Sequence, residues 1–287
     1  MSANLFDEAL ARLHAGDPAG ARELFARAAA AGDRRAEVVH TNFLAAGVGG
    51  PRDWPAVVER LRTLAAAGGR WAVELAAIEA MDLTEDGEPR TLPAPEPVSE
   101  QPHVVRFPGL FTPAECTYLR NAAAPLLTPS VVVDPVSGRQ RPDPQRTSHA
   151  AGFNVMLEYP ATHALNRRIA AASGTAPEQG EPLQILRYDV GGEYRVHFDA
   201  IPGFRNQRIL TMLVWLNEGY EGGKTYFPAT KLTLSGAPGD AILFRNTGAD
   251  GRQDPTSAHA GLPVRAGEKW LASRWIRERP FDYSDPR

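Results

Sequence analysis

Residues 183–199 read LQILRYDVGGEYRVHFD, the stretch that decides the fold of the second half of the chain. A short β-rich run, 183–188, is followed by a Gly-Gly pair and by a second run that ends at His197-Phe198-Asp199. Side chains two positions apart on a strand point the same way, so we expect His197 and Asp199 to face one point in space. This pair begins a candidate metal site.

A second imidazole from a distant strand would complete such a site, and His259 is the best candidate for it. Two histidines and one carboxylate form the face that holds non-haem Fe(II) and leaves coordination positions open. A His-x-Asp pattern alone arises often by chance. Lys269 adds weight, because it follows His259 by ten residues and is one of only three lysines among 31 basic residues.

Strand alternation gives a second check on Lys269. Residues 269, 271, 273 and 275 share one face of a predicted strand, so an inward Lys269 places Trp275 inward as well. The alternative is a solvent-facing Lys269 with Trp275 packed beneath the helices, since an unpaired lysine is rarely buried.

The chain changes texture at Val104, from which point short β-rich runs are separated by Gly, Pro and Asn. We predict strands over 183–188, 209–216, 241–244 and 269–276, and helices over 113–124 and 163–172. The expected fold class of residues 104–287 is α+β, dominated by an antiparallel sandwich of the jelly-roll type.

Residues 1–85 form a separate, all-α region in this interpretation. They are rich in alanine and arginine, with apolar positions at helical spacing. AAAAGD at 28–33 recurs as LAAAGG at 64–69, a period of 36 residues that is typical of paired-helix repeats and resembles Sel1-like repeats. Two roles stay open for this region, a cap on the barrel or a binding site for a protein partner. Residues 86–103, rich in proline and acid, are predicted to be a linker.

The charge composition of the chain argues against nucleic acid as a binding partner. With 31 basic and 34 acidic residues the net charge is −3, so the chain lacks the broad cationic surface that nucleic acid requires. Its start shows no cationic stretch followed by an apolar one, and no window approaches the roughly 18 apolar residues of a membrane span. We expect a soluble, cytoplasmic protein. Cys116 is the only cysteine, so the chain forms no internal disulfide.

Residues 104–279 resemble the prolyl 4-hydroxylase branch of the Fe(II)- and 2-oxoglutarate-dependent dioxygenases. The matching pieces, in order along the chain, are RTS at 146–148, LRY at 186–188, YRVHFD at 194–199, RILT at 208–211, EGGKTYFP at 221–228, GDAILF at 239–244 and the stretch 259–275. The resemblance implies a double-stranded β-helix as the catalytic domain.

The resemblance also implies the roles of individual residues. The implied iron ligands and catalytic residues are His197, Asp199 and His259. The implied ligands of the distal carboxylate of 2-oxoglutarate are Lys269, assisted by Tyr188 and Thr225. The implied substrate residues are Tyr194, Arg208 and Trp275, with Arg146 at the border of the active-site lid as a further candidate. Tyr194 lies an odd number of residues before His197, so it needs a bulge or turn to reach the iron.

The implied cofactors are Fe(II), 2-oxoglutarate and O2, with ascorbate as a candidate reductant, and the implied reaction is hydroxylation of an unactivated C–H bond of a proline-like cyclic amino acid. Only 200–207 separates Asp199 from Arg208, and this short segment favours a free amino acid such as proline or pipecolate. The helical region favours the alternative, a peptidyl prolyl 4-hydroxylase that recruits its protein substrate through the repeats. A non-catalytic scaffold and a cupin-like zinc or manganese hydrolase or isomerase are further alternatives.

Overall fold

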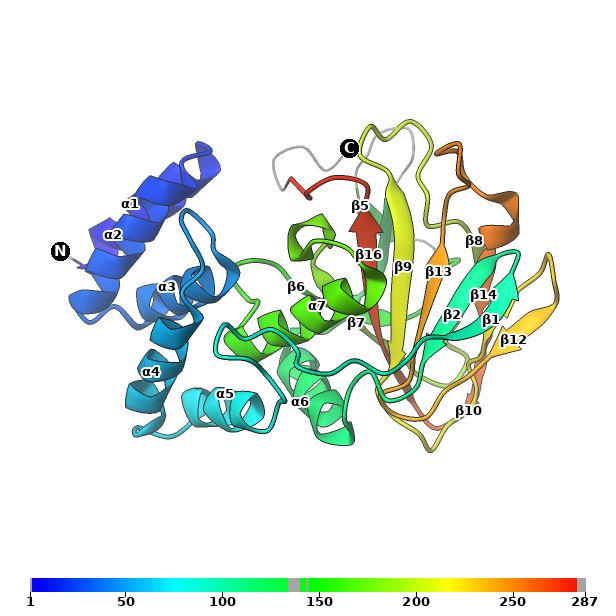
Figure 1. Cartoon of the computed structure of the whole chain (residues 1–287), viewed down its shortest axis with the longest axis horizontal. Coiled ribbons are helices and arrows are strands. Elements are labelled where there is room, and N and C mark those ends of the chain that lie inside the picture. Colours follow the sequence, from blue (N-terminus) through cyan, green and yellow to red (C-terminus); the bar gives the residue numbers. More distant parts are fainter. Residues whose placement is uncertain (1, 134–139, 143, 283–287) are drawn as a thin grey trace. The chain divides into compact units, whose positions relative to one another are not determined.

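The computed structural model describes residues 2–133, 140–142 and 144–282 (Figure 1). The chain divides into two compact units, the first made of Met1–Thr91 and Phe153–Arg168 and the second of Leu92–Gly152 and Ile169–Arg287. None of the described helices is long and apolar enough to span a membrane.

The first unit is helical, as the apolar spacing of residues 1–85 predicts. Its helices are α1 (Ser2–His14), α2 (Pro18–Ala30), α3 (Arg34–Ala46), α4 (Trp54–Ala65) and α5 (Arg70–Glu79), joined by the first part of α7 (Pro160–Ser173). Aspartate side chains cap α2, α3 and α4 by accepting backbone N–H groups of the first turn. Phe6, Phe25 and Phe43 pack edge to face in the core of this unit. The similarity to Sel1-like repeats stays a prediction.

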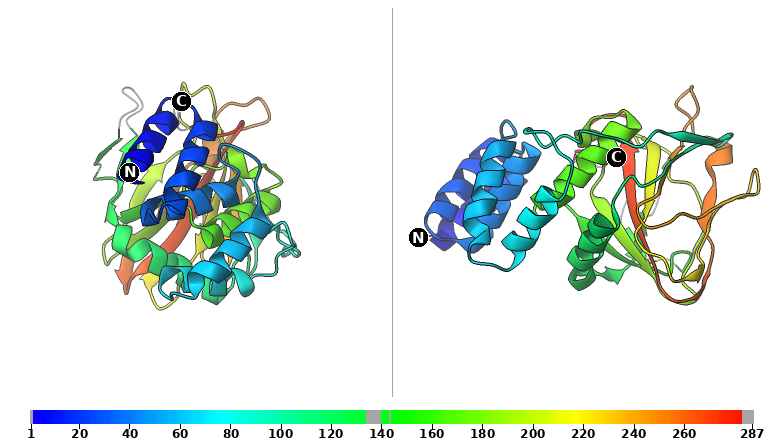
Figure 2. Two further views of the ribbon diagram at one scale, coloured as in Figure 1. Left: turned by 90° about the vertical axis from the view of Figure 1, so that its left-hand side faces the viewer. Right: turned by 60° about the horizontal axis from the view of Figure 1, so that its bottom comes forward.

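The second unit is built on two antiparallel sheets, which Figures 1 and 2 show as two layers. The eight-stranded sheet has the order β1-β2-β13-β9-β16-β7-β6-β3 and the four-stranded sheet the order β12-β11-β14-β8. The strands of the first are β1 (Glu96–Glu100), β2 (His103–Phe107), β13 (Ala241–Arg245), β9 (Arg208–Trp215), β16 (Lys269–Arg277), β7 (Leu183–Tyr188), β6 (His149–Phe153) and β3 (Thr128–Pro129). Those of the second are β12 (Leu232–Leu234), β11 (Thr225–Phe227), β14 (His259–Gly261) and β8 (Tyr194–His197). This arrangement is jelly-roll-like, as expected from the sequence.

Smaller elements complete the second unit. They are α6 (Pro113–Ala123), the strand pairs β10 (Glu221–Gly222) with β15 (Val264–Ala266) and β4 (Val131–Val133) with β5 (Gln140–Pro142), and the short 3-10 turns η1 (Ala124–Leu126), η2 (Pro177–Gln179) and η3 (Pro255–Ser257). A reciprocal capping box between Thr112 and Glu115 starts α6. Apolar side chains of β2, β7, β9, β13 and β16 meet Phe227 of β11 in one core.

Two predicted boundaries differ from the structure. The range 86–103, predicted as a linker, contains strand β1, which pairs with β2 at the edge of the large sheet. An edge strand tolerates proline, and the register shifts between Pro97 and Ser99, so composition alone conceals this strand. The helical unit also includes 153–168, which the sequence analysis assigned to the β-rich domain.

Candidate active site

Adjacent strands bring the two predicted histidine ligands together. His197 ends β8, His259 begins β14, and the two residues are directly paired in the antiparallel register. Asp199 follows β8 and is buried. Ligand atoms of these three side chains all lie within 4.8 Å of one another. The structure therefore brings together the set that the His-x-Asp pattern and His259 predict.

The orientation of the imidazoles fits a metal ion. His197 Nδ1 lies 2.8 Å from the Arg195 carbonyl oxygen, and His259 Nδ1 lies 3.0 Å from that of Ser257. A carbonyl accepts only from a protonated Nδ1, which leaves the Nε2 lone pair as the metal donor. Each Nε2 is 3.6 Å from an oxygen of Asp199, Oδ1 for His197 and Oδ2 for His259. Two imidazole nitrogens and one carboxylate in this arrangement suit Fe(II).

Burial and charge adjust the protonation of this set. Burial alone would raise the pKa of Asp199, but the neighbouring imidazoles of His259 and His197 and the Thr211 hydroxyl outweigh it and hold the pKa well below its usual range. Burial, helped by the nearby His197, lowers the pKa of His259 to about 4. An ionised carboxylate beside a neutral imidazole is the form in which both groups can bind a metal.

Lys269 lies in the same pocket and is buried, with 2% of its surface exposed. The alternative of a solvent-facing lysine is therefore wrong. Its Nζ donates to the Gly223 carbonyl at 2.5 Å and lies 5.5 Å from the centroid of the Tyr188 ring, its partner in the β16–β7 register. Burial lowers the pKa of Lys269 to about 8. The Gly223 carbonyl takes one of the three donors of this ammonium, which leaves two that can bind an anionic group.

Most of the other predicted site residues line this pocket, whose cavity volume is about 40 Å³. The predicted residues among its lining are Tyr188, Thr225, Tyr194, Trp275 and Arg146. Burial raises the pKa of Tyr188 and that of Tyr194, the latter to about 12, so both phenols stay neutral hydrogen-bonding groups. The rings of Tyr188, Tyr194 and Trp275 thus add aromatic surface to a pocket that also holds the polar groups described above.

Tyr194 reaches the pocket through an irregularity in β8. Tyr194 pairs with Gly261 and His197 with His259, so three steps along β8 oppose two along β14. This bulge turns Tyr194 back toward the iron-ligand side, and its ring stacks on His197 with centroids 3.4 Å apart. The bulge that the odd spacing requires lies within β8 itself.

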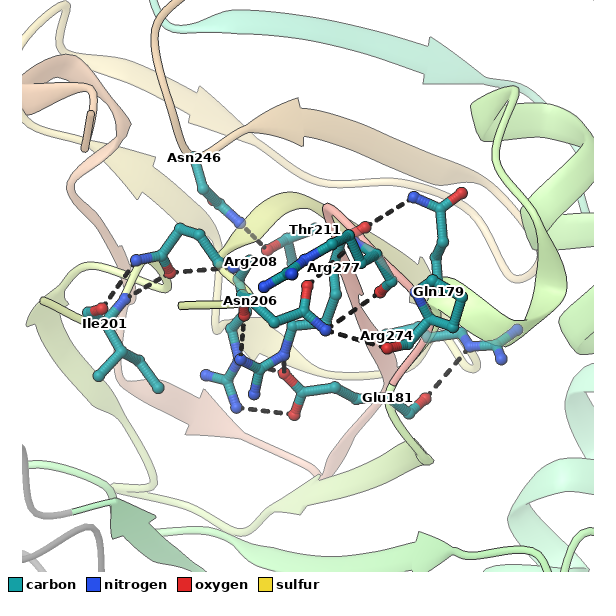
Figure 3. Close-up of polar contacts among 12 residues, drawn as sticks. Gln179, Glu181, Ile201, Asn206, Arg208, Thr211, Asn246, Arg274 and Arg277 are labelled. Carbon is teal, nitrogen blue, oxygen red and sulfur yellow. Dashed lines mark hydrogen bonds and ion pairs between the residues drawn. The ribbon is translucent and has the colours of Figure 1, made fainter. Parts of the chain in front are cut away.

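Arg208 is the one predicted site residue that is not among the pocket lining. Its Nε and Nη2 donate to the two carboxylate oxygens of Glu181 at 2.6 and 2.9 Å, and Arg277 forms a second ion pair with Glu181 (Figure 3). Its guanidinium packs on the Trp275 ring. Arg208 therefore supports the pocket wall, because a buried carboxylate occupies its hydrogen-bonding edge.

Sequence reasoning missed three buried residues around this site. Glu181 neutralises Arg208, and Asn246 donates to Thr211 at 2.9 Å (Figure 3). Thr211 in turn donates to Asp199 at 2.6 Å. Thr211 lies on β9 and Asn246 directly follows β13, so neither is a close sequence neighbour of Asp199, and no local pattern marks them. Glu181 lies just before β7. It is one of 34 acidic residues, and nothing in the surrounding sequence distinguishes it from the others.

Comparison with known proteins identifies the family. Residues 183–277 match the family model described as the 2OG-Fe(II) oxygenase superfamily. The chain is 36% identical over 204 residues to prolyl 4-hydroxylase 1 of Arabidopsis thaliana, covering 64% of this chain and 72% of that protein. It is 32% identical over 209 residues to probable prolyl 4-hydroxylase 3 of the same plant, covering 63% and 71%.

Among solved structures, a viral collagen prolyl hydroxylase from Paramecium Bursaria Chlorella virus-1 in complex with 2OG matches with a TM-score of 0.46 and 28% identity, covering 61% of this chain and 95% of that one. The sequence relationships to the plant enzymes establish the family, and the His-Asp-His set is present. The chain belongs to the 2OG-Fe(II) oxygenase superfamily, in its prolyl 4-hydroxylase type, and is an oxidoreductase that uses Fe(II), 2-oxoglutarate and O2.

Proposed function

We propose that this enzyme hydroxylates a carbon of a proline-like ring in the pocket of the second unit. In this proposal His197, Asp199 and His259 hold Fe(II), and Lys269 binds the distal carboxylate of 2-oxoglutarate with Tyr188 and Thr225 beside it. The observation that supports it most is the placement of a buried ammonium and a converging His-Asp-His set in one pocket. Bound Fe(II), with 2-oxoglutarate and O2, supplies the oxidant, while 2-oxoglutarate leaves as succinate and carbon dioxide.

In this proposal the residues of the pocket bind the 2-oxoglutarate carboxylate, orient the substrate ring and keep water away from both. The Lys269 ammonium offers charge-assisted hydrogen bonds to a carboxylate in a region from which water is largely excluded, which strengthens them. Tyr194 and Trp275 present aromatic surface to the pocket, against which a saturated ring can be held. Holding the C–H bond in one orientation is the protein's main contribution to the rate.

A free cyclic amino acid is the first candidate substrate. The segment 200–207 is short and bound back on itself, since Gln207 exchanges two hydrogen bonds with the Ile201 backbone at 2.7 and 2.9 Å. It is also tied to the end of β16 and the residues after it, because the Asn206 carbonyl accepts from Arg277 (Figure 3) and the Asn206 side chain donates to the Pro280 carbonyl. A short, fastened segment offers little surface for covering an extended peptide.

A prolyl residue within a chain is the second candidate, and one observation favours it. Arg146 lines both the pocket and an adjoining open groove. The groove is lined by Pro129, Ser130, Pro144, Thr147, Ser148 and His149 as well. A groove that shares Arg146 with the pocket offers a place for the flanking residues of a peptide. For this candidate we also propose that the helical unit recruits the protein substrate, and for both candidates a cytoplasmic location.

Direct assay separates the two candidates. The enzyme is incubated with Fe(II), 2-oxoglutarate and either free L-proline, free L-pipecolate or a proline-rich peptide, and each product is analysed by mass spectrometry for the gain of one oxygen atom. Gain on a free amino acid with matching succinate supports the first candidate, and gain on the peptide alone supports the second. If no proline-like compound is oxidised under conditions in which the enzyme turns 2-oxoglutarate into succinate, the proposed substrate class is wrong. His259→Ala serves as the control without the proposed iron site.

A further inference from the structure

A buried chain of hydrogen bonds continues from Asp199 away from the pocket. The Thr211 hydroxyl donates to Asp199 Oδ2 at 2.6 Å, and Asn246 Nδ2 donates to Thr211 Oγ1 at 2.9 Å. Thr211 and Asn246 are both fully buried. Figure 3 shows the Asn246 side chain directed at Thr211. These hydrogen bonds link β9, which carries Thr211, to Asn246, the residue that follows β13.

Asn246 determines which group donates and which accepts in this series of hydrogen bonds. A threonine hydroxyl has one proton, and an ionised carboxylate only accepts. The proton of Thr211 must therefore point to Asp199, and the group behind Thr211 must be a donor. The amide nitrogen of Asn246 can donate but cannot accept, so it prevents the hydroxyl from turning away from Asp199.

The backbone of Asn246 is tied to the other proposed ligand. Its N–H donates to the Ile209 carbonyl at 2.9 Å, and its carbonyl accepts from the Asp254 N–H at 3.0 Å. Asp254 caps the short turn η3, and Ser257 at the end of that turn offers its carbonyl to His259 Nδ1 at 3.0 Å. One residue thus connects the partner of Asp199 with the turn that orients His259.

The second polar atom of the Asn246 side chain indicates a role other than stability. Within the described part of the chain, Asn246 Oδ1 is buried and has no hydrogen-bond partner. An unsatisfied buried acceptor costs on the order of 1–3 kcal/mol, and an apolar side chain of similar size would avoid that cost. The hydrogen bond from Asn246 Nδ2 to Thr211 therefore explains the presence of this amide better than a contribution to the stability of the fold does.

We infer that Asn246 is a positioning residue for metal binding, which acts by holding the Thr211 hydroxyl on Asp199. The inference rests on the proposed function, in which Asp199 and His259 hold the metal. Partners that orient metal ligands typically change metal affinity by about 10-fold to 100-fold when they are removed. They need not contribute to folding, and this difference makes the inference testable.

The test uses Mn(II) binding to the full chain, measured by calorimetry without turnover. Asn246→Leu removes the donor and the unsatisfied acceptor in a side chain of similar size. We expect Mn(II) affinity to fall about 10-fold or more, while the apo protein melts at the same temperature as the wild type or higher. Thr211→Val should weaken Mn(II) binding at least as much, and Thr211→Ser should retain it. Thr233→Val, the same change at an exposed position of β12, is the matched control.

A double variant separates positioning from a general packing effect. If Asn246 acts through the Thr211 hydroxyl, Asn246→Leu should change Mn(II) affinity no further in the Thr211→Val background. Additive losses, wild-type affinity in Asn246→Leu, or a fall in melting temperature without a fall in affinity would each overturn the inference. Failure of the wild type to bind Mn(II), or binding that persists in His259→Ala, would instead contradict the proposed metal site.

Discussion

The guanidinium carbon of Arg208 lies 3.7 Å from the centroid of the Trp275 ring, while two nitrogens of the same guanidinium donate to Glu181. Trp275 lines the pocket and is 7% exposed. The cation thus fixes the ring through stacking, and Glu181 fixes the cation. The coulombic attraction of Glu181 more than offsets the burial that would lower the pKa of Arg208, so this pKa is raised and the cation stays charged.

Removing Glu181 should destabilise the protein. Glu181→Ala leaves two buried guanidinium groups, those of Arg208 and Arg277, without their carboxylate, and losing one partner of a buried ion pair typically costs about 3–5 kcal/mol. Urea denaturation followed by far-UV circular dichroism measures the free energy of unfolding. Glu178→Ala, at an exposed site nearby, is the control and should change it by less than about 0.5 kcal/mol. Equal effects of both variants would show that the buried ion pair does not stabilise the fold.

His259→Ala should abolish iron-dependent succinate formation and leave the protein folded. The substitution removes one of three converging metal ligands, and the remaining pair, His197 and Asp199, binds a metal much more weakly. Succinate is quantified in anaerobically iron-loaded protein after addition of O2. His103→Ala, which removes an exposed imidazole of β2, should keep wild-type activity. Succinate formation that survives in His259→Ala would place the metal elsewhere.

Lys269→Ala should chiefly weaken the binding of 2-oxoglutarate. The loss of a charge-assisted hydrogen bond in a buried site is worth about 1.5–3 kcal/mol, which corresponds to roughly a 10-fold to 150-fold rise in the dissociation constant. Titration of 2-oxoglutarate into anaerobic Fe(II)-loaded protein, followed by its visible charge-transfer band, gives this constant. Lys231→Ala, at an exposed lysine, is the control. An unchanged dependence on 2-oxoglutarate would refute the proposed role of Lys269.

The affinity for 2-oxoglutarate should depend on pH through Lys269. Burial lowers its pKa to about 8, so the ammonium that attracts a carboxylate is present below that pH and is lost above it. The dissociation constant should therefore stay level up to about pH 8 and then rise about tenfold per pH unit. Measuring it from about pH 7 to about pH 9.5 tests the sign. In Lys269→Arg the charge persists over this range, so whatever affinity remains should not show the same break.

The predictions and the structure agree for those features that depend on residues close together in the sequence. The His-x-Asp spacing correctly predicted that His197 and Asp199 lie close together, although Asp199 follows the end of β8, and alternation along β16 correctly placed Lys269 and Trp275 on the side that lines the pocket. The strand over 183–188 and the helix near 113–124 appear as β7 and α6, because apolar spacing and capping residues act within a few positions. Strand β1 was not predicted, because this edge strand has too little alternation of apolar and polar residues to be recognised from its sequence.

The sequence by itself therefore determined the chemistry of this protein: which residues can bind a metal, which lysine is unusual, and which runs form strands. Only the tertiary structure decided that His259 pairs with His197, that a bulge turns Tyr194 onto His197, and that Glu181 holds Arg208 away from the pocket lining. The reason is physical. Side-chain direction within a strand follows from local backbone geometry, whereas strand register and buried polar pairs depend on the packing of segments distant in sequence.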